Sequence, residues 1–242
     1  MCIFVDLKQR MKQIKTKLLT HIKSFLGLPR NTSNDRVLVT LGIPKFKCKL
    51  LCRYLDVAAK YIRKFNEFPE MYRKTLEEMV DEYNLDWDKS ELQKEILARD
   101  PVKIRNQMEE KSLKQMAGNL NIELGVNYSA NVRNIYKRCF KEDHLIVKYF
   151  CNIGFFRKIY QALCPKCKKE NSREHAIDDC EQFKPQRDEL LAELKALDKR
   201  LGAMTITKAI EEIYYRPRGV EDKKEKCLEW MRKCITTLYK TR

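Results

Sequence analysis

Four side chains of metal-binding type lie close together in the segment CPKCKKENSREHAIDDC, which runs from Cys164 to Cys180. Two residues separate Cys164 from Cys167, seven separate Cys167 from His175, and four separate His175 from Cys180. Two thiolates at the first spacing can hold an ion from one tight turn, and the His–Cys pair can complete a tetrahedron from the start of a following helix. Three thiolates and one imidazole suit Zn²⁺, so the spacing predicts one bound zinc ion.

The predicted zinc site is closed and structural. Four protein ligands leave no coordination position for the water that a catalytic zinc needs. The loop between the ligands is too short to bury a core, so metal binding is expected to contribute its folding energy directly. The alternative is a coincidence in a chain with ten cysteines. This alternative is weakened because the chain has only three histidines, and one of them lies at a ligand spacing between Cys167 and Cys180.

No other motif predicts catalysis. The chain has no glycine-rich phosphate loop, no G-x-S-x-G elbow and no H-E-x-x-H pair. The run Ala176–Asp179 ends in two aspartates, as in polymerases that hold magnesium, but that use requires a β-hairpin and a third carboxylate. Asp178 and Asp179 lie between two predicted zinc ligands, where acids at a helix start interact favourably with the helix dipole. We therefore expect no catalytic residues and no small-molecule substrate.

The spacing of Cys48 and Cys52, one helical turn apart, leaves two interpretations. They are half of a metal site, or small side chains buried on a helix face. No second pair with a nearby histidine accompanies them, so burial is the prediction. The sequence predicts neither a secretion signal nor a membrane span, because no apolar run approaches the length of either. We expect an intracellular protein, nuclear or cytoplasmic, with reduced cysteines.

The elements that must position these residues are predicted to be helices almost throughout. We therefore expect an all-α fold of multi-helix bundle regions, with a small CCHC zinc knuckle near the C-terminus. Ser33 or Asn34 is suited to cap a short helix. Pro69 and Pro101 each stand where a first helical position is expected, and Asp100 suits a cap for the second.

Two of the predicted helices carry apolar residues at spacings of three and four, which places those residues on one face. We expect both stripes to face a core. The first stripe is Leu7, Met11, Ile14, Leu18, Ile22 and Phe25, and the second is Phe46, Leu50, Tyr54, Val57, Tyr61 and Phe65. Later helices are predicted over residues 131–141, 143–160, 185–200, 203–215 and 221–239.

The charge of the chain is large and unevenly distributed. Fifty Lys and Arg residues against 34 acids give a net charge of +16. Residues 1–64 have a net charge of +12, residues 65–125 of −5 and residues 126–242 of +9. Such a positive balance favours polyanionic partners, above all nucleic acid. The predicted domains are a basic helical region (1–66), an acidic helical segment (67–123), a helical region before the knuckle (124–163), the knuckle (164–183) and C-terminal helices (184–242).

Basic side chains in two regions are the candidate contacts to phosphates, which give affinity without reading sequence. Tyr54 and Tyr61 are interleaved with the N-terminal charges and suit base stacking, but they also fit the apolar stripe, and core positions are the prediction. The candidates in the N-terminal region are Lys8, Lys12, Lys15, Arg30, Lys45, Lys47, Lys49 and Arg53, and those around the knuckle are Lys166, Lys168, Lys169 and Arg173.

Two segments of the chain resemble the reverse transcriptases of LINE-type (non-LTR) retrotransposons. SFLGLPRNTSND at residues 24–35, LGIPKF at 41–46 and the helix to Phe65 resemble the stretch after the polymerase palm. LIVKYF at 145–150, the four knuckle residues, Glu174, Phe183 and Arg187 resemble the family's C-terminal zinc knuckle and the helix before it. The matches occur in the family's order and bracket about residues 20–190.

The resemblance implies a C-terminal piece of a reverse transcriptase, with thumb and linker helices and a zinc knuckle. The palm with its magnesium-binding aspartates is missing, so we expect no polymerase activity from this chain. The implied partners are template RNA and target DNA. A helical protein-interaction or assembly module with a structural zinc site is the alternative. Membrane-surface docking by the helix over residues 6–26 is not expected, because that helix has no Trp and only a thin apolar stripe.

Overall fold

The fold is all-α. A computed structural model describes residues 2–125, 128, 132, 143–151, 163–164, 166–170, 172–216 and 223–240. The described residues form helices joined by turns, and the only β-structure among them is an isolated antiparallel bridge between Leu163 and Glu170. This confirms the predicted fold class. No helix within these ranges is long and apolar enough to cross a membrane.

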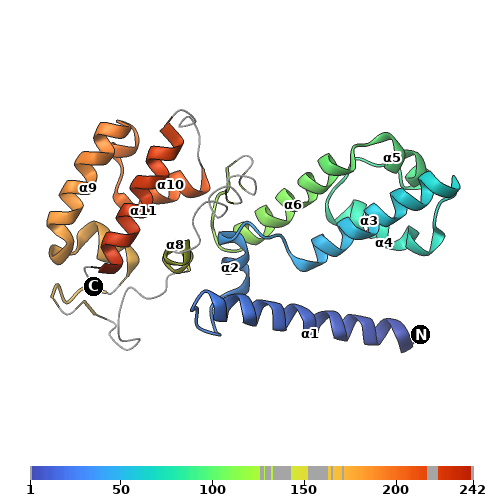
Figure 1. The fold of residues 1–242 in the computed structure, drawn as a ribbon, viewed down its shortest axis with the longest axis horizontal. Coiled ribbons are helices and arrows are strands. Elements are labelled where there is room, and N and C mark those ends of the chain that lie inside the picture. Colours follow the sequence, from blue (N-terminus) through green and yellow to red (C-terminus); the bar gives the residue numbers. More distant parts are fainter. Residues whose placement is uncertain are drawn as a thin grey trace. The chain divides into compact units, whose positions relative to one another are not determined.

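The chain forms two compact units (Figure 1). Unit 1 combines Met1–Leu41 with Glu123–Arg242, and unit 2 is the continuous segment Gly42–Ile122. Unit 1 therefore joins the N-terminal helices to the segment that carries the four metal-type ligands. The predicted division into five segments stays a prediction.

The helices of unit 1 enclose aromatic side chains. Phe150 stacks on Tyr214 with 4.1 Å between the ring centroids. The hydroxyl of Tyr214 donates a hydrogen bond to the carbonyl of Thr40, and that of Tyr128 donates to the carbonyl of Val39 at 2.8 Å. These bonds tie the N-terminal part of the unit to its C-terminal part. The α-helices described in this unit are α1 (Cys2–Phe25), α2 (Asn34–Thr40), α8 (Asp143–Phe150), α9 (Lys184–Leu197), α10 (Ile206–Tyr215) and α11 (Lys224–Lys240).

Unit 2 is built around its longest helix, α3 (Phe46–Phe65), which packs against α4 (Arg73–Glu82), α5 (Leu92–Ala98) and α6 (Pro101–Gly118). One face of α3 enters the core through Leu51, Leu55 and Ile62. Cys48 and Cys52 are buried on the same face, which confirms the prediction that they are core side chains.

The predicted helix caps are confirmed in two places and differ in a third. Ser33 caps α2, its hydroxyl accepting a hydrogen bond from the backbone N–H of Arg36 at 3.4 Å. Asp100 caps α6, its carboxylate accepting from the N–H of Val102 at 2.9 Å. Pro69 is not a first helical residue of α4. It precedes a 3-10 turn over Glu70–Tyr72, and α4 begins after that turn.

The predicted apolar stripe of α3 is wrong. The structure buries a neighbouring face of the helix most deeply and leaves Val57, Tyr61 and Phe65 exposed. Both faces of α3 carry apolar residues at helical spacing, so periodicity alone does not choose between them. The face that is buried is lined by small and aliphatic side chains, which pack closely against the neighbouring helices. Tyr61 is therefore not a core residue, in contrast to the prediction, and Tyr54 is partly buried.

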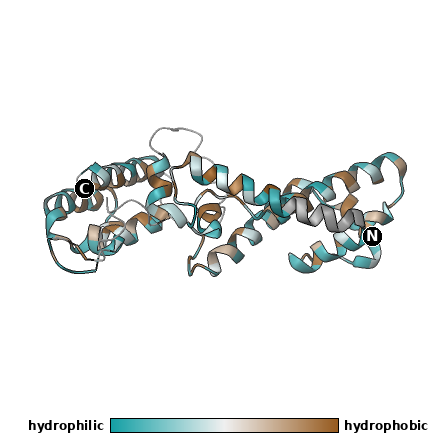
Figure 2. Ribbon diagram, turned by 90° about the horizontal axis from the view of Figure 1, so that it is seen from below, coloured by the Kyte–Doolittle hydropathy of each residue, from teal (hydrophilic) through white to brown (hydrophobic). Residues whose placement is uncertain are grey.

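The predicted stripe of α1 is only partly buried. Leu19 is buried and Ile22 packs against a small cluster with Leu28, whereas Ile14 and Leu18 are about half exposed. The side chains of Leu7 and Met11 lie outside the described residues. Figure 2 colours the helices by hydropathy and shows hydrophobic and hydrophilic residues interspersed along them. Of the later predicted helices, residues 131, 133–141, 152–160 and 221–222 also lie outside the described part.

Candidate metal centre

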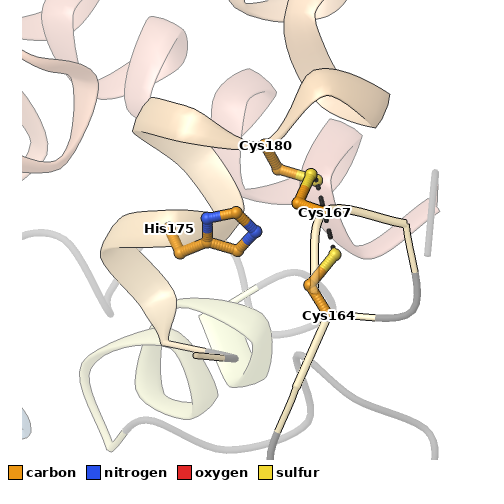
Figure 3. Close-up of side chains that lie close together, drawn as sticks. All are labelled: Cys164, Cys167, His175 and Cys180. Atoms are coloured by element: carbon orange, nitrogen blue, oxygen red, sulfur yellow. Dashed lines mark hydrogen bonds between the residues drawn. The ribbon is translucent and has the colours of Figure 1, made fainter. Parts of the chain in front are cut away.

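The four predicted ligands converge in space. Their ligating atoms all lie within 4.8 Å of one another. The Sγ atom of Cys180 is 3.9 Å from that of Cys164 and 3.8 Å from that of Cys167 (Figure 3). Three sulfurs around a tetrahedral zinc, each about 2.3 Å from the ion, would lie about 3.8 Å apart. This Cys₃His cluster has the geometry to hold a metal ion.

The two N-terminal ligands are held by a tight turn. The N–H of Cys164 donates to the carbonyl of Lys169 at 2.8 Å, and the N–H of Lys168 donates to the carbonyl of Cys164 at 2.9 Å. The turn closes through Lys168, whose φ of +58° lies in the left-handed region. The bridge between Leu163 and Glu170 fixes the ends of the turn. These backbone bonds direct Cys164 and Cys167 to one side.

The two C-terminal ligands are placed by one turn of π-helix over His175–Asp179. Its wider spacing brings the N–H of Cys180 to the carbonyl of His175 at 2.7 Å. Ser172 caps the start of this segment, its hydroxyl accepting from the N–H of His175 at 3.0 Å. Arg187 of α9 donates to the carbonyl of Cys180 and to that of Ile177, both at 3.2 Å. Side chains on both sides thus fix the backbone of the ligand segment.

The imidazole of His175 indicates a ligand most directly. The side chain is buried, and neither Nδ1 nor Nε2 has a hydrogen-bond partner among the described residues. Leaving a buried polar atom unsatisfied costs about 1–3 kcal/mol, so native proteins rarely do it. Figure 3 shows the three sulfur atoms together on one side of this ring. A metal ion at that place would satisfy one of the two nitrogens.

The thiols of the cluster differ in acidity. Burial by itself raises the pKa of Cys164, but the backbone N–H of Cys167 and the nearby His175 side chain stabilise the thiolate. The pKa of Cys164 falls to about 6 as a result. For Cys180, burial and the neighbouring sulfurs raise the pKa. Near neutral pH, Cys164 is therefore mostly a thiolate and Cys180 mostly a thiol.

We expect metal affinity to rise with pH above about 6, because the raised pKa of Cys180 keeps this thiol protonated and the ion must displace the proton. Each displaced proton changes affinity by roughly tenfold per pH unit. Below a pH of about 6 the dependence becomes steeper, since Cys164 then binds a proton as well. Competition with a chelator of known pH dependence measures the affinity. A constant affinity across this range would contradict the assigned protonation states.

The Asp178–Asp179 pair has a structural contact that agrees with the non-catalytic interpretation of its sequence. The carboxylate of Asp178 accepts a hydrogen bond from the N–H of Thr207 at 3.2 Å. Thr207 is in the first turn of α10, where backbone N–H groups lack helical partners and favour an acid. Asp178 thereby connects the metal-ligand segment to α10.

The basic residues of the knuckle fall into two groups. Lys166, Lys168 and Lys169 are exposed, and no salt bridge joins them to a carboxylate in the part of the chain that is described. The side chain of Arg173 is only 12% exposed and forms salt bridges with Glu174 at 2.8 Å and Glu211 at 2.6 Å. Its guanidinium also lies over the ring of Tyr149, 5.1 Å from the centroid. The predicted contact at Arg173 is thus occupied by internal partners.

The N-terminal candidates also differ from one another. Lys47 pairs with Glu82 at 2.5 Å, and Lys49 pairs with the buried Glu109. Lys45 is partly buried, and the side chain of Lys8 lies outside the described residues. The candidates that are exposed, with no salt bridge to any described carboxylate, are Lys12, Lys15, Arg30 and Arg53.

Sequence reasoning missed the network around Arg173. Its partners Glu211 and Tyr149 lie 38 residues after it and 24 residues before it, and no motif marks either of them. The spacing of the cysteines and histidine was the signal that predicted the ligands.

No family model, curated protein or solved structure matches the chain. The resemblance to non-LTR reverse transcriptases therefore stays a prediction that rests on the residues named for it.

Proposed function

We propose that this chain is a non-catalytic nucleic-acid-binding module with one structural zinc ion at Cys164, Cys167, His175 and Cys180. The observation that carries the metal part is the buried, unpartnered His175 imidazole beside three sulfurs. Zinc fits because three thiolates and one imidazole are its common ligand set, and the sulfur separations suit a tetrahedral ion. Four protein ligands would fill that tetrahedron, so the ion would hold the fold and supply no reactive water.

Exposed cations support the nucleic-acid part of the proposal. Lys166, Lys168 and Lys169 lie on the turn that carries two metal ligands, and none of them has a salt bridge among the described residues. A metal-held turn keeps such charges in a fixed arrangement, as small zinc knuckles do when they bind single strands. The resemblance adds template RNA and target DNA as the expected partners.

Binding to an oligonucleotide is expected to weaken steeply with salt. If six or more phosphates are contacted, affinity falls by about 10³-fold between roughly 50 and 200 mM salt, because condensed counterions are released on binding. A filter-binding titration of the full chain at several salt concentrations measures this slope. Binding that does not depend on salt, or no binding at all, would contradict the proposal.

A second candidate function is helix-mediated assembly, which the exposed apolar residues of α1 favour. Ile14 and Leu18 are four residues apart on one face and are 51% and 48% exposed. Such a face is a common contact for another amphipathic helix. Light scattering distinguishes the two candidates. A stable oligomer that is lost in an Ile14→Lys, Leu18→Lys variant, together with no oligonucleotide binding, would favour assembly.

A further inference from the structure

The outer face of α3 carries an exposed apolar stripe. Val57, Tyr61 and Phe65 follow at intervals of four residues, so they lie along one side of the helix. They are 46%, 38% and 52% exposed. The core of unit 2 lies on a different face of α3, and its cluster of buried residues does not include these three side chains. We call it, with the cations beside it, the α3 patch.

Cations lie beside the stripe. Arg53, Lys60 and Lys64 lie along one edge of the stripe and are exposed. In the described part of the chain, no carboxylate forms a salt bridge with any of them. Asp56, the acid of α3, is held by Arg105 of α6 at 2.8 Å. The patch therefore combines apolar surface with uncompensated positive charge.

The aromatic rings of the patch lie close together. The ring centroids of Tyr61 and Phe65 are 4.8 Å apart, and the two ring planes are tilted by 47°. The ammonium group of Lys64 lies 5.1 Å from the centroid of the Phe65 ring. Rings that are exposed and flanked by cations offer flat faces for bases and charges for the phosphates between them.

We propose that the α3 patch binds single-stranded nucleic acid, with bases stacked on Tyr61 and Phe65 and phosphates contacted by Arg53, Lys60 and Lys64. This inference rests on the proposed nucleic-acid-binding function and gives it a specific site in unit 2. A protein partner fits less well, since the centres of protein interfaces are depleted of charge, whereas cations lie along this stripe. A duplex fits less well, because its bases are already stacked on each other and cannot stack on side chains.

The test measures binding of the full chain to single-stranded oligouridylate and oligothymidylate of about 20 nucleotides and to a duplex of the same length. Tyr61→Ala and Phe65→Ala are each expected to weaken single-strand binding by roughly five- to 150-fold, and duplex binding much less. The slope of affinity against salt stays unchanged in both variants. Tyr61→Phe keeps the ring and is expected to keep the affinity.

The cations are tested by the salt slope. Lys60→Ala and Lys64→Ala are each expected to lower the single-strand slope by about 0.7, the value for one lost phosphate contact. Two matched controls lie in the same unit. Met71→Ala removes an apolar side chain that is 81% exposed, and Lys74→Ala removes an exposed cation of α4. Neither control is expected to change the affinity as the patch variants do.

The outcomes separate this inference from the proposed function. Salt-dependent binding by the wild-type chain that Tyr61→Ala and Phe65→Ala leave unchanged would overturn the α3 patch alone. An equal loss of single-strand and duplex binding would overturn the stacking role. Absence of any binding by the wild-type chain would overturn both the patch and the proposed function. Circular dichroism of each variant establishes that it is folded.

Discussion

Replacing Cys167 with serine or His175 with alanine is expected to remove the proposed zinc ion and to unfold the loop between its ligands. Without a metal, the segment is held by the turn bonds around Cys164, by the caps at Ser172 and Arg187, and by the contacts of Arg173 and Asp178 with α8 and α10. Metal binding in zinc-finger peptides contributes an apparent 10–16 kcal/mol near neutral pH, roughly the whole stability of such a module. We therefore expect the zinc content to fall from one ion per chain to nearly none, with a clear loss of thermal stability.

A cysteine outside the cluster provides the control for this prediction. Cys227 of α11 is buried, as most of the ligands are. Cys227→Ser is expected to cost some packing energy but to leave the metal content unchanged. His175→Cys keeps four ligands and is expected to keep the metal. If Cys167→Ser and His175→Ala leave both metal content and thermal unfolding as in the wild type, the ligand assignment is wrong.

Arg173→Ala is expected to have the second largest effect, on stability and not on nucleic-acid binding. The substitution leaves Glu211 without its partner at 2.6 Å and removes the cation from the face of Tyr149. Because Glu211 keeps a third of its side-chain surface exposed, we expect a cost of about 2–4 kcal/mol, between that of an exposed pair and that of a buried one. Urea unfolding measures this cost.

Arg200→Ala is the matched control for Arg173→Ala. Arg200 pairs with Glu212, the residue next to Glu211 on α10, but its side chain is 50% exposed. The expected cost is below about 1 kcal/mol. Equal costs for the two variants would show that Arg173 has no special structural role. If Arg173→Ala instead lowers oligonucleotide affinity and leaves stability unchanged, Arg173 is a phosphate contact, as the sequence predicted.

The helices and their caps could be predicted because local chemistry sets them. Ser33 and Asp100 cap helices through short-range bonds that any chain with these residues can form. The buried face of α3 could not be predicted in the same way. Two of its faces are apolar at helical spacing, and the choice between them depends on packing against α4, α5 and α6, which local periodicity does not encode.

The candidate metal centre could also be predicted from local spacing, because all four ligands lie within one short segment. The support for that segment could not. Arg173 depends on Glu211 of α10 and Tyr149 of α8, and Asp178 depends on Thr207. Such pairings become visible only once the helices are packed, because a lone arginine or aspartate in a basic segment resembles any solvent-facing charge.

The discontinuous composition of unit 1 affects how the protein is made on the ribosome. Unit 2 is one continuous segment, so all of its residues have been synthesised once residue 122 is added. It can therefore fold while the rest of the chain is still being translated. The hydrogen bond from Tyr214 to the carbonyl of Thr40 cannot form until 174 further residues have been synthesised. At about 5–20 residues per second, that delay is roughly 10–35 s. During this time the basic N-terminal helices lack their final partners, at a stage when the ribosome's own RNA is the nearest polyanion.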